Sequence, residues 1–224
     1  MTGIPGISKK RIFLVDDHAL VREGLADLIN QRPDLMICGE ADCPHDAMNG
    51  IATSQPDLAI VEPMLKNTLA LELIKDLKRL HPNVAVLVFS MHDESLYAER
   101  ALRSGASGYI MKREPTGKII DAIYRILEGK IYIGDILGKI VTSRYLEEAS
   151  TETGAAVQRL SDRELGVFRL LGQGHESSEI AAVLQISVKA ARSHCRRIQE
   201  KLGLDSSRKL LCEAIHWYGA SKTR

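Results

Sequence analysis

The first 130 residues alternate between two kinds of segment, and this alternation limits the fold more than any other feature of the chain. Short apolar runs such as Ile12–Val15 and Val84–Phe89 are typical of strands that are covered on both faces. The segments between such runs, for example Ala19–Asn30, carry apolar residues at helical spacing. Strands that alternate with helices in this way predict an α/β domain built on a parallel sheet.

We expect five strands and five helices in this domain. The expected strands are Ile12–Val15, Met36–Cys38, Leu58–Val61, Val84–Phe89 and Gly108–Ile110. The expected helices are Ala19–Asn30, Pro44–Ser54, Leu69–Leu80, Glu94–Ser104 and Pro115–Glu128. Proline is well tolerated at the first position of a helix, which supports the two helix starts at proline. In such a sheet the functional crevice lies at the carboxyl ends of the strands.

Acidic and polar residues directly follow the expected strands. Asp16 and Asp17 follow the first strand, Glu62 the third, Ser90 the fourth and Lys112 the fifth. Three carboxylates in one pocket repel one another and need a cation, and oxygen ligands with water suit Mg²⁺. An Asp-Asp pair alone could equally cap the following helix. The hydroxyl and ammonium groups at the other strand ends favour a site.

This part of the chain resembles the receiver domain of two-component response regulators over about residues 9–130. The resemblance is carried by the segments IFLVDDHALVREGLADLI, PDLAIVEPMLKNTLALELIKDLK, VLVFSMHDE and ALRSGASGYIMKRE. It implies a flavodoxin-like, five-stranded domain in which an aspartate after the third strand takes a phosphoryl group from a histidine kinase. It also implies the roles of the pocket residues: an acidic pair that holds Mg²⁺, a switch hydroxyl, a switch aromatic and a phosphate-pairing lysine, which fall on Asp16 with Asp17, Ser90, Tyr109 and Lys112.

The chain departs from the family at the centre of this pocket, where Glu62 stands in place of the phosphoacceptor aspartate and Pro63 follows it. One extra methylene group displaces the carboxylate by roughly an ångström, which can cost on the order of 100-fold in rate. Three interpretations remain. The pocket is an unphosphorylated remnant; or Glu62 reaches Lys112 and Ser90 and partly mimics a phospho-aspartate; or the glutamate is itself phosphorylated with Mg²⁺. We expect phosphorylation not to be required, and Mg²⁺ not to be either.

The last part of the chain has a different charge and a different pattern. Residues 1–154 contain 18 Lys and Arg against 22 Asp and Glu, whereas residues 155–224 contain 12 against 7, so only the second part has the charge to meet a polyanion. Four helices are expected there. The first begins after the N-cap Ser161, with Glu164 completing a capping box, and ends near Gly172. The others are Ser177–Leu184, a helix capped by Ser187 that ends before Gly203, and Ser207–Trp217.

The third of these helices has two unlike faces. An apolar stripe of Ala191, Cys195, Ile198 and Leu202 lies opposite a basic surface, and Glu200 is the one acidic residue between Lys189 and Lys201. Two short helices joined by a tight turn indicate a helix-turn-helix, and a helix fits the major groove of DNA. An ordinary solvated helix would carry charges of both signs more evenly.

The segment LSDRELGVFRLLGQGHESSEIAAVLQISVKAARSHCRRIQEKLGL resembles the four-helix DNA-binding domain of the NarL/FixJ subfamily, often called LuxR-type. The resemblance implies base-reading positions at Arg192, Ser193 and Arg196, phosphate contacts at Lys189 and Lys201, and a homodimer on inverted repeats. We add Arg197, which flanks the same face. Two departures, at Ala190-Ala191 and at Ser193, leave the preferred DNA sequence open.

We expect three regions: a receiver-like domain over residues 9–130, a linker helix (Asp135–Glu148) and linker over 131–157, and a helix-turn-helix domain over 158–220. No run of about 18 apolar residues predicts a membrane span, and the N-terminus does not have the pattern of a signal peptide. The cysteines Cys38, Cys43, Cys195 and Cys212 are far apart in sequence, which favours idle thiols in a reducing cytoplasm.

We therefore predict a cytoplasmic, sequence-specific DNA-binding transcriptional regulator that is not an enzyme. Its expected partners are double-stranded promoter DNA, a second copy of itself, and a sensor histidine kinase or another regulatory protein. One alternative is a conventional phosphorylation-switched response regulator. Another is a receiver-type protein-interaction module whose basic helix serves a protein partner.

Overall fold

The computed structural model describes residues 9–65, 68–91, 94–134 and 156–223. They form an α/β unit, which contains a six-stranded sheet, and a helical unit, which contains α8 to α11. Each unit is described by itself. The helix that we predicted over Asp135–Glu148 lies outside the described residues. In the described part of the chain, no helix has both the length and the apolar character needed to cross a lipid bilayer.

The sheet of the α/β unit is parallel throughout, with the strand order β2-β1-β3-β6-β7-β8. Its strands are β1 (Lys10–Val15), β2 (Leu35–Ala41), β3 (Leu58–Val61), β6 (Ala85–Ser90), β7 (Gly108–Met111) and β8 (Tyr132–Ile133). Two further short strands, β4 (Met64–Leu65) and β5 (Thr68–Leu69), pair with each other. The predicted parallel α/β fold is confirmed.

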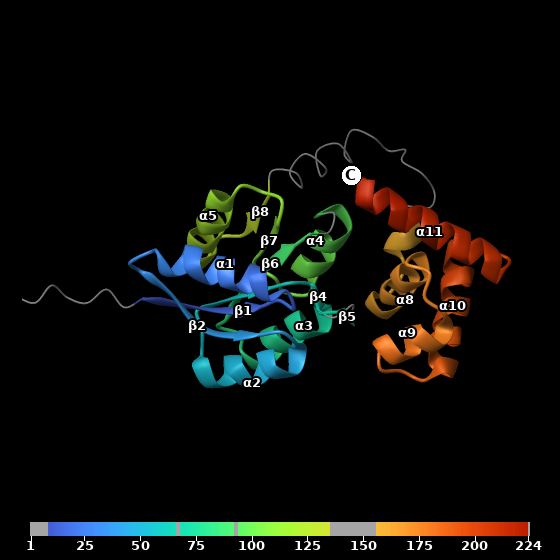
Figure 1. Ribbon diagram of the computed structural model, residues 1–224, viewed down its shortest axis with the longest axis horizontal. Coiled ribbons are helices and arrows are strands. Elements are labelled where there is room, and N and C mark those ends of the chain that lie inside the picture. Colours follow the sequence, from blue (N-terminus) through green and yellow to red (C-terminus); the bar gives the residue numbers. More distant parts are fainter. Residues whose placement is uncertain (1–8, 66–67, 92–93, 135–155, 224) are drawn as a thin grey trace, which may run out of the picture. The chain divides into compact units, whose positions relative to one another are not determined.

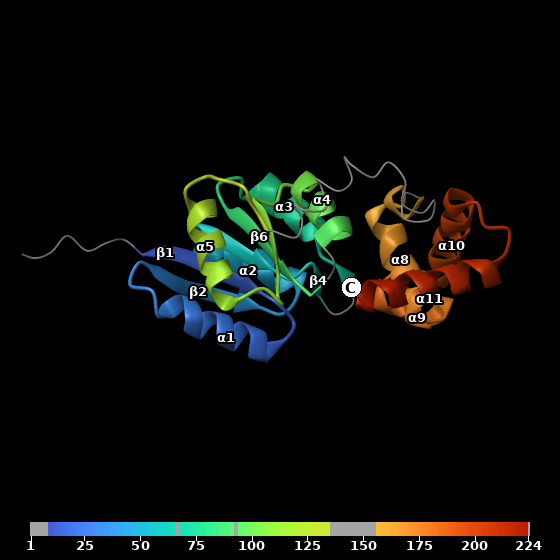
Figure 2. The ribbon, with the colours of Figure 1, turned by 90° about the horizontal axis from the view of Figure 1, so that it is seen from above.

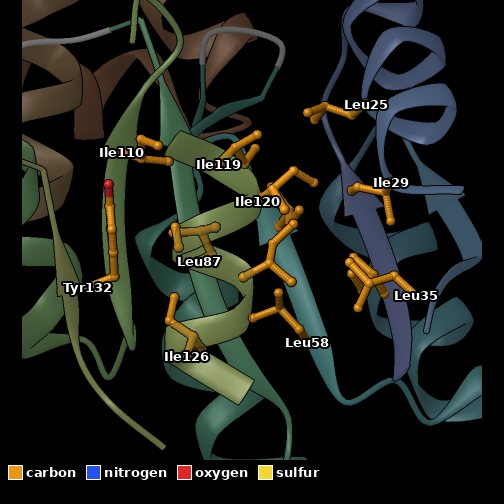
Figure 3. Packing of buried hydrophobic residues seen from close by; sticks show 14 of the residues in the cluster. Leu25, Ile29, Leu35, Leu58, Leu87, Ile110, Ile119, Ile120, Ile126 and Tyr132 are labelled. Carbon is orange, nitrogen blue, oxygen red and sulfur yellow. The ribbon is translucent and has the colours of Figure 1, made fainter. Parts of the chain in front are cut away.

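Helices α1 (Ala19–Asn30) and α5 (Thr116–Leu127) lie on the same side of the sheet, and α2 (Pro44–Ser54), α3 (Leu71–Leu80) and α4 (Glu94–Arg103) complete the unit (Figure 1). The α1 and α5 side is packed with Leu25 and Ile29 from α1, four isoleucines from α5, and alternate strand residues such as Leu58 and Leu87 (Figure 3). The isoleucines are Ile119, Ile120, Ile123 and Ile126. These side chains are branched aliphatics, as the low aromatic content of 4% requires. The pattern follows from the alternation of side chains along a strand.

Phe13 shows why the other half of the β1 pattern is also buried. It alternates with Ile12 and Leu14, and it is 2% exposed. A Cβ added at Gly39 of β2 or at Gly50 of α2 would lie 2.5 Å from atoms of its ring. The two glycines therefore make room for the largest side chain of β1 beneath α2.

The sheet has one strand more than the five that we predicted. Strand β8 begins at Tyr132, beyond residue 130, and Tyr132 donates its N–H to the carbonyl of Ser107 at 3.1 Å. A strand of two residues has no periodicity to detect, and its pairing with β7 forms only in the folded sheet. A smaller difference concerns Leu69, which belongs to β5 and not to the following helix.

The helical unit consists of α8 (Asp162–Gly172), α9 (Ser177–Val183), α10 (Val188–Leu202) and α11 (Ser207–Thr223). Helix α11 packs against α8 (Figure 2), and the rings of Phe168 and Trp217 lie 5.5 Å apart between centroids. The predicted caps are present. Ser161 and Glu164 form a capping box, Ser187 accepts the N–H of Ala190, and Gly203 ends α10 with a left-handed φ of 68°. The predicted four-helix domain is confirmed.

Candidate acidic pocket and nucleic-acid interface

The carboxyl ends of β1, β3, β6 and β7 bring the predicted pocket residues together. These strands are adjacent and parallel, so Asp16, Glu62, Ser90 and Lys112 leave the sheet at one edge. Lys112 Nζ contacts Asp16 Oδ2 and lies 2.8 Å from Glu62 Oε2. The side chains are almost fully buried, with exposed fractions of 7% for Lys112, 5% for Asp16 and 4% for Glu62. The pocket is therefore a buried ion-pair cluster.

Both oxygens of the Glu62 carboxylate have donors within the chain. Oε1 accepts the backbone N–H of Met64 at 3.0 Å and the hydroxyl of Ser90 at 3.3 Å, and Oε2 faces Lys112. Burial raises the pKa of Glu62 above its ordinary value, because Lys112 and the Met64 N–H offset the loss of hydration only in part. Burial alone would lower the pKa of Lys112, but Glu62 and Asp16 hold it above the ordinary value.

Asp16 and Asp17 lie beside His18, which sequence reasoning missed. His18 Nδ1 is 3.2 Å from Asp16 Oδ1 and 3.0 Å from Asp17 Oδ1, and the His18 N–H donates to Asp16 Oδ1 at 2.9 Å. Each of the three residues offers a ligand atom within 4.8 Å of the others. The adjacency in sequence was a signal, but only the turn after β1 shows that the imidazole folds back onto both carboxylates.

Two further residues support the pocket without having been predicted. Arg22 of α1 donates from Nη1 to the carbonyl of Asp16 at 2.6 Å and pairs with Glu40 through Nε at 3.2 Å. The Phe89 ring lies 5.6 Å from Lys112 Nζ, a cation–π distance. No sequence pattern distinguishes Arg22 from a surface arginine, since its contacts depend on how α1 packs beside β2.

Tyr109 and Asp57 both lie away from the buried ion-pair cluster. Tyr109 of β7 is fully buried, two register positions before the pair of Ser90 and Met111 at the edge that carries the pocket. Asp57 precedes β3 at the opposite end of the sheet, where it accepts the N–H of Arg11 at 2.8 Å and pairs with Lys10 at 2.9 Å. Asp57 therefore serves the start of β1 and cannot replace Glu62.

Helix α10 presents the basic surface that the sequence predicts. Ala191 and Ile198 are fully buried against the rest of the helical unit, whereas the basic surface is exposed: Lys189, Arg192, Ser193, Arg196 and Arg197. Arg196 Nε pairs with Glu200 Oε1 at 3.2 Å. Among the residues that the structure describes, Arg192 has no hydrogen-bond or ion-pair partner. This surface has the charge and the width of a helix that can enter a major groove.

Lys201 differs from the other predicted contacts because it is engaged within the helical unit. Its ammonium group pairs with Glu164 of α8 at 2.6 Å and donates to the carbonyl of Arg159 at 3.2 Å. The Glu164 side chain is 4% exposed and that of Lys201 is 38% exposed. Lys201 lies at the edge between the two faces of α10, which explains why it reaches the acid of the first helix.

The Glu164–Lys201 pair predicts how stability depends on pH. Burial alone would raise the pKa of Glu164, but hydrogen bonds from Lys201 and Ser161 hold that pKa below its ordinary value of 4.5. The carboxylate therefore contributes stability that is fully present above the ordinary pKa and is lost as pH falls through the lower, folded value. We expect Glu164→Gln to flatten this part of the profile. Lys201→Met should cost about 1–3 kcal/mol near neutral pH, because it leaves a buried carboxylate unpaired.

Denaturation at a series of pH values measures the stability of the helical unit. It is followed by the fluorescence of Trp217, the only tryptophan in the chain. Asp205→Asn is the matched control, since the Asp205–Lys209 pair is exposed. An unchanged acid limb in Glu164→Gln would contradict the assignment.

Comparison with known proteins gives matches for both units. Residues 12–124 match the family model of the response regulator receiver domain, and residues 158–214 match that of the bacterial regulatory proteins of the luxR family. The oxygen regulatory protein NreC of Staphylococcus carnosus is 29% identical over 209 residues, covering 92% of this chain and 96% of that protein. The transcriptional regulatory protein DegU of Brevibacillus brevis is 26% identical over 221 residues, with 93% and 94% coverage.

Solved structures agree with these matches. A two-component response regulator of the LuxR family from Aurantimonas has a TM-score of 0.58 and 32% identity, covering 62% of this chain and 99% of that one. RcsB from Salmonella enterica serovar Typhimurium, bound to promoter DNA in the presence of phosphomimetic BeF₃⁻, has a TM-score of 0.68 and 23% identity, covering 92% and 98%. At that identity the second likeness shows the fold alone. The chain belongs to the response regulator family, as a two-component regulator of the NarL/FixJ type in which a receiver domain precedes a LuxR-type DNA-binding domain.

Proposed function

We propose that this protein is a cytoplasmic transcription regulator that binds promoter DNA as a homodimer and whose receiver domain works without phosphorylation. Members of its family are DNA-binding regulators and not enzymes. RcsB, which shares the fold, is described as bound to promoters and as dimers on DNA. The exposed basic surface of α10 supports the same role here, with Lys189, Arg192, Ser193, Arg196 and Arg197 facing the DNA.

Independence from phosphorylation is supported by the contacts of Glu62: both oxygens of its carboxylate already have donors within the chain. The hydroxyl of Ser90, the ammonium group of Lys112 and the N–H of Met64 all point at its carboxylate. These are the kinds of donor that would bind a phosphoryl group on a shorter aspartate. Glu62 therefore fills the position from within the chain, and its negative charge holds Ser90 and Lys112 where a phosphoryl group would otherwise hold them.

Receiver domains typically bind Mg²⁺ for phosphorylation, and Asp16 and Asp17 have the oxygen chemistry that such an ion prefers. They are the residues that would hold it, and the ion would neutralise charge in the pocket. Lys112, however, already contacts Asp16 and Glu62, so the cluster has a cation of its own. The proposed function therefore does not depend on a divalent ion.

Substitution of Glu62 tests whether its charge sets the state of the receiver. In buffer without a phosphoryl donor, Glu62→Gln should weaken promoter binding by the whole chain, because the amide loses the ion pair with Lys112. Affinity is measured by fluorescence anisotropy on a labelled duplex selected from a random pool. Asp34→Asn, directly before β2 and at the opposite end of the strands from the pocket, serves as a control for the loss of one acid. Equal affinity in Glu62→Gln and the unaltered chain would refute the mimicry.

Phosphorylation is tested separately by intact mass after incubation with acetyl phosphate and Mg²⁺. We expect no added phosphoryl group on the unaltered chain. Glu62→Asp shortens the side chain by one methylene and opens space beside Ser90 and Lys112, so that variant should gain one. A phosphoryl group on the unaltered chain would contradict independence from phosphorylation.

A further inference from the structure

Glu200 occupies a place in α10 where an acidic residue is unfavourable for three reasons. It lies in the last turn of the helix, where the helix dipole disfavours negative charge. It follows Arg196 by four residues, and an acid placed after its basic partner supports a helix less well than one placed before it. It also lies on the surface that meets DNA phosphates, which repel it.

Glu200 contacts Arg196, one of the residues proposed to read DNA bases. Its carboxylate accepts a hydrogen bond from Nε of Arg196 at 3.2 Å. Both side chains are largely exposed, Glu200 at 64% and Arg196 at 82%. Engaging Nε leaves both terminal nitrogens of the guanidinium group without a hydrogen-bond or ion-pair partner among the described residues. Arginine reads guanine through two parallel hydrogen bonds to O6 and N7, and the terminal pair can supply both.

We infer that Glu200 is a positioning residue that orients Arg196 for the recognition of one guanine in each half-site. This rests on the proposed role of α10 in DNA binding. A guanidinium group held in one orientation loses less side-chain freedom when it binds a base edge. The negative charge also lowers affinity for phosphates at every sequence. Glu200 therefore lowers affinity for DNA of every sequence and raises discrimination at one base pair.

Arg192 gives the internal comparison. It lies one helical turn before Arg196 on the same exposed surface, and among the described residues it has no acidic partner. Loss of Glu200 should thus leave the base pair read by Arg192 unchanged.

The experiment selects binding sites for the full-length chain from a pool of random duplex DNA. Competition between the selected duplex and its single-base variants is then measured for the unaltered chain, Arg192→Ala, Arg196→Ala, Glu200→Gln and Asp205→Asn. Arg196→Ala should reduce discrimination for guanine at one position by roughly 5- to 150-fold. Glu200→Gln should reduce it at that same position by about 2- to 5-fold, the range of an exposed ion pair.

Glu200→Gln should at the same time bind random-sequence duplex more tightly, which a merely structural role would not produce. Asp205→Asn removes an equally exposed, paired acid outside α10 and should change neither quantity. Unchanged discrimination in Glu200→Gln, or an equal loss at the Arg192 position, would overturn the inference. So would a cytosine preference that persists in Arg196→Ala and disappears in Glu200→Gln, because Glu200 would then read the base itself. If Arg196→Ala affects no base pair, the inference also falls, whereas the proposed role of α10 in DNA binding is judged separately by Arg192→Ala.

Discussion

Lys112→Met should destabilise the α/β unit by about 3–5 kcal/mol, because it removes the ammonium group that pairs with both Asp16 and Glu62 in the buried cluster. Breaking a buried ion pair from one side leaves a charge that is neither hydrated nor compensated. The loss should be smaller at acid pH than at alkaline pH. Since burial already raises the pKa of Glu62, this carboxyl group takes up a proton when the ammonium group is absent.

The direction of this pH dependence follows from the two protonation states of Glu62. At a pH below the raised pKa, Glu62 is neutral with or without Lys112, so only the pairing of Lys112 with Asp16 is lost. As pH rises, the unaltered chain keeps a charge pair, while the variant must either hold a proton or carry an unpaired charge. The stability difference between variant and unaltered chain therefore grows with pH.

Hydrogen exchange of the amides in β1, β3 and β6 measures this stability. Trp217 fluorescence, which reports on the helical unit, should be unaffected and gives an internal control. Lys130→Met is the matched variant, because the Lys130–Glu128 pair is exposed and exposed ion pairs contribute little to stability. If Lys112→Met costs no more than Lys130→Met, the pocket is hydrated and the argument for a self-neutralised cluster fails.

Arg192→Ala should weaken binding to a selected promoter duplex by about 1–3 kcal/mol and relax specificity at one base pair. Arg192 is exposed on α10 and has no partner among the described residues, so truncating it costs the fold little. Its guanidinium group is free to meet a base edge, and the loss should therefore appear on the preferred site far more than on random DNA.

Gel shifts over a range of salt concentrations, on the selected duplex and on a random-sequence duplex, separate base contacts from phosphate contacts. Phosphate contacts make affinity fall steeply with salt, whereas a base contact changes the affinity ratio between the two duplexes. Lys189→Ala is the comparison: it should weaken both duplexes alike and reduce the salt slope by about 1. An equal loss on both duplexes for Arg192→Ala would refute a base-reading role.

Local features of the fold could be predicted because their causes lie within a few residues. The capping box of Ser161 and Glu164, the Ser187 cap and the left-handed Gly203 each depend on hydrogen bonds or backbone freedom inside one turn. The buried strands could be predicted for a similar reason, since burial on both faces leaves a continuous apolar run.

Contacts between distant segments could not be predicted in the same way. Strand β8 is too short to show a period and exists through its pairing with β7. The family resemblance implied a phosphate contact for Lys201, but no sequence pattern showed that the edge of α10 on which it lies also faces Glu164, 37 residues earlier. Arg22 meets the loop after β1 only because α1 folds back over it.

For the pocket, the sequence by itself determined that Asp16, Glu62, Ser90 and Lys112 meet, because parallel strands deliver the residues at their carboxyl ends to one edge of the sheet. It also determined that an acid longer than aspartate stands at the centre. Only the tertiary structure decided how the charges are distributed. The start of β4 presents the N–H of Met64 to Glu62, and β7 places Lys112 between Glu62 and Asp16. Those contacts depend on distances across neighbouring strands, which are set by the packed sheet and leave no pattern in the chain.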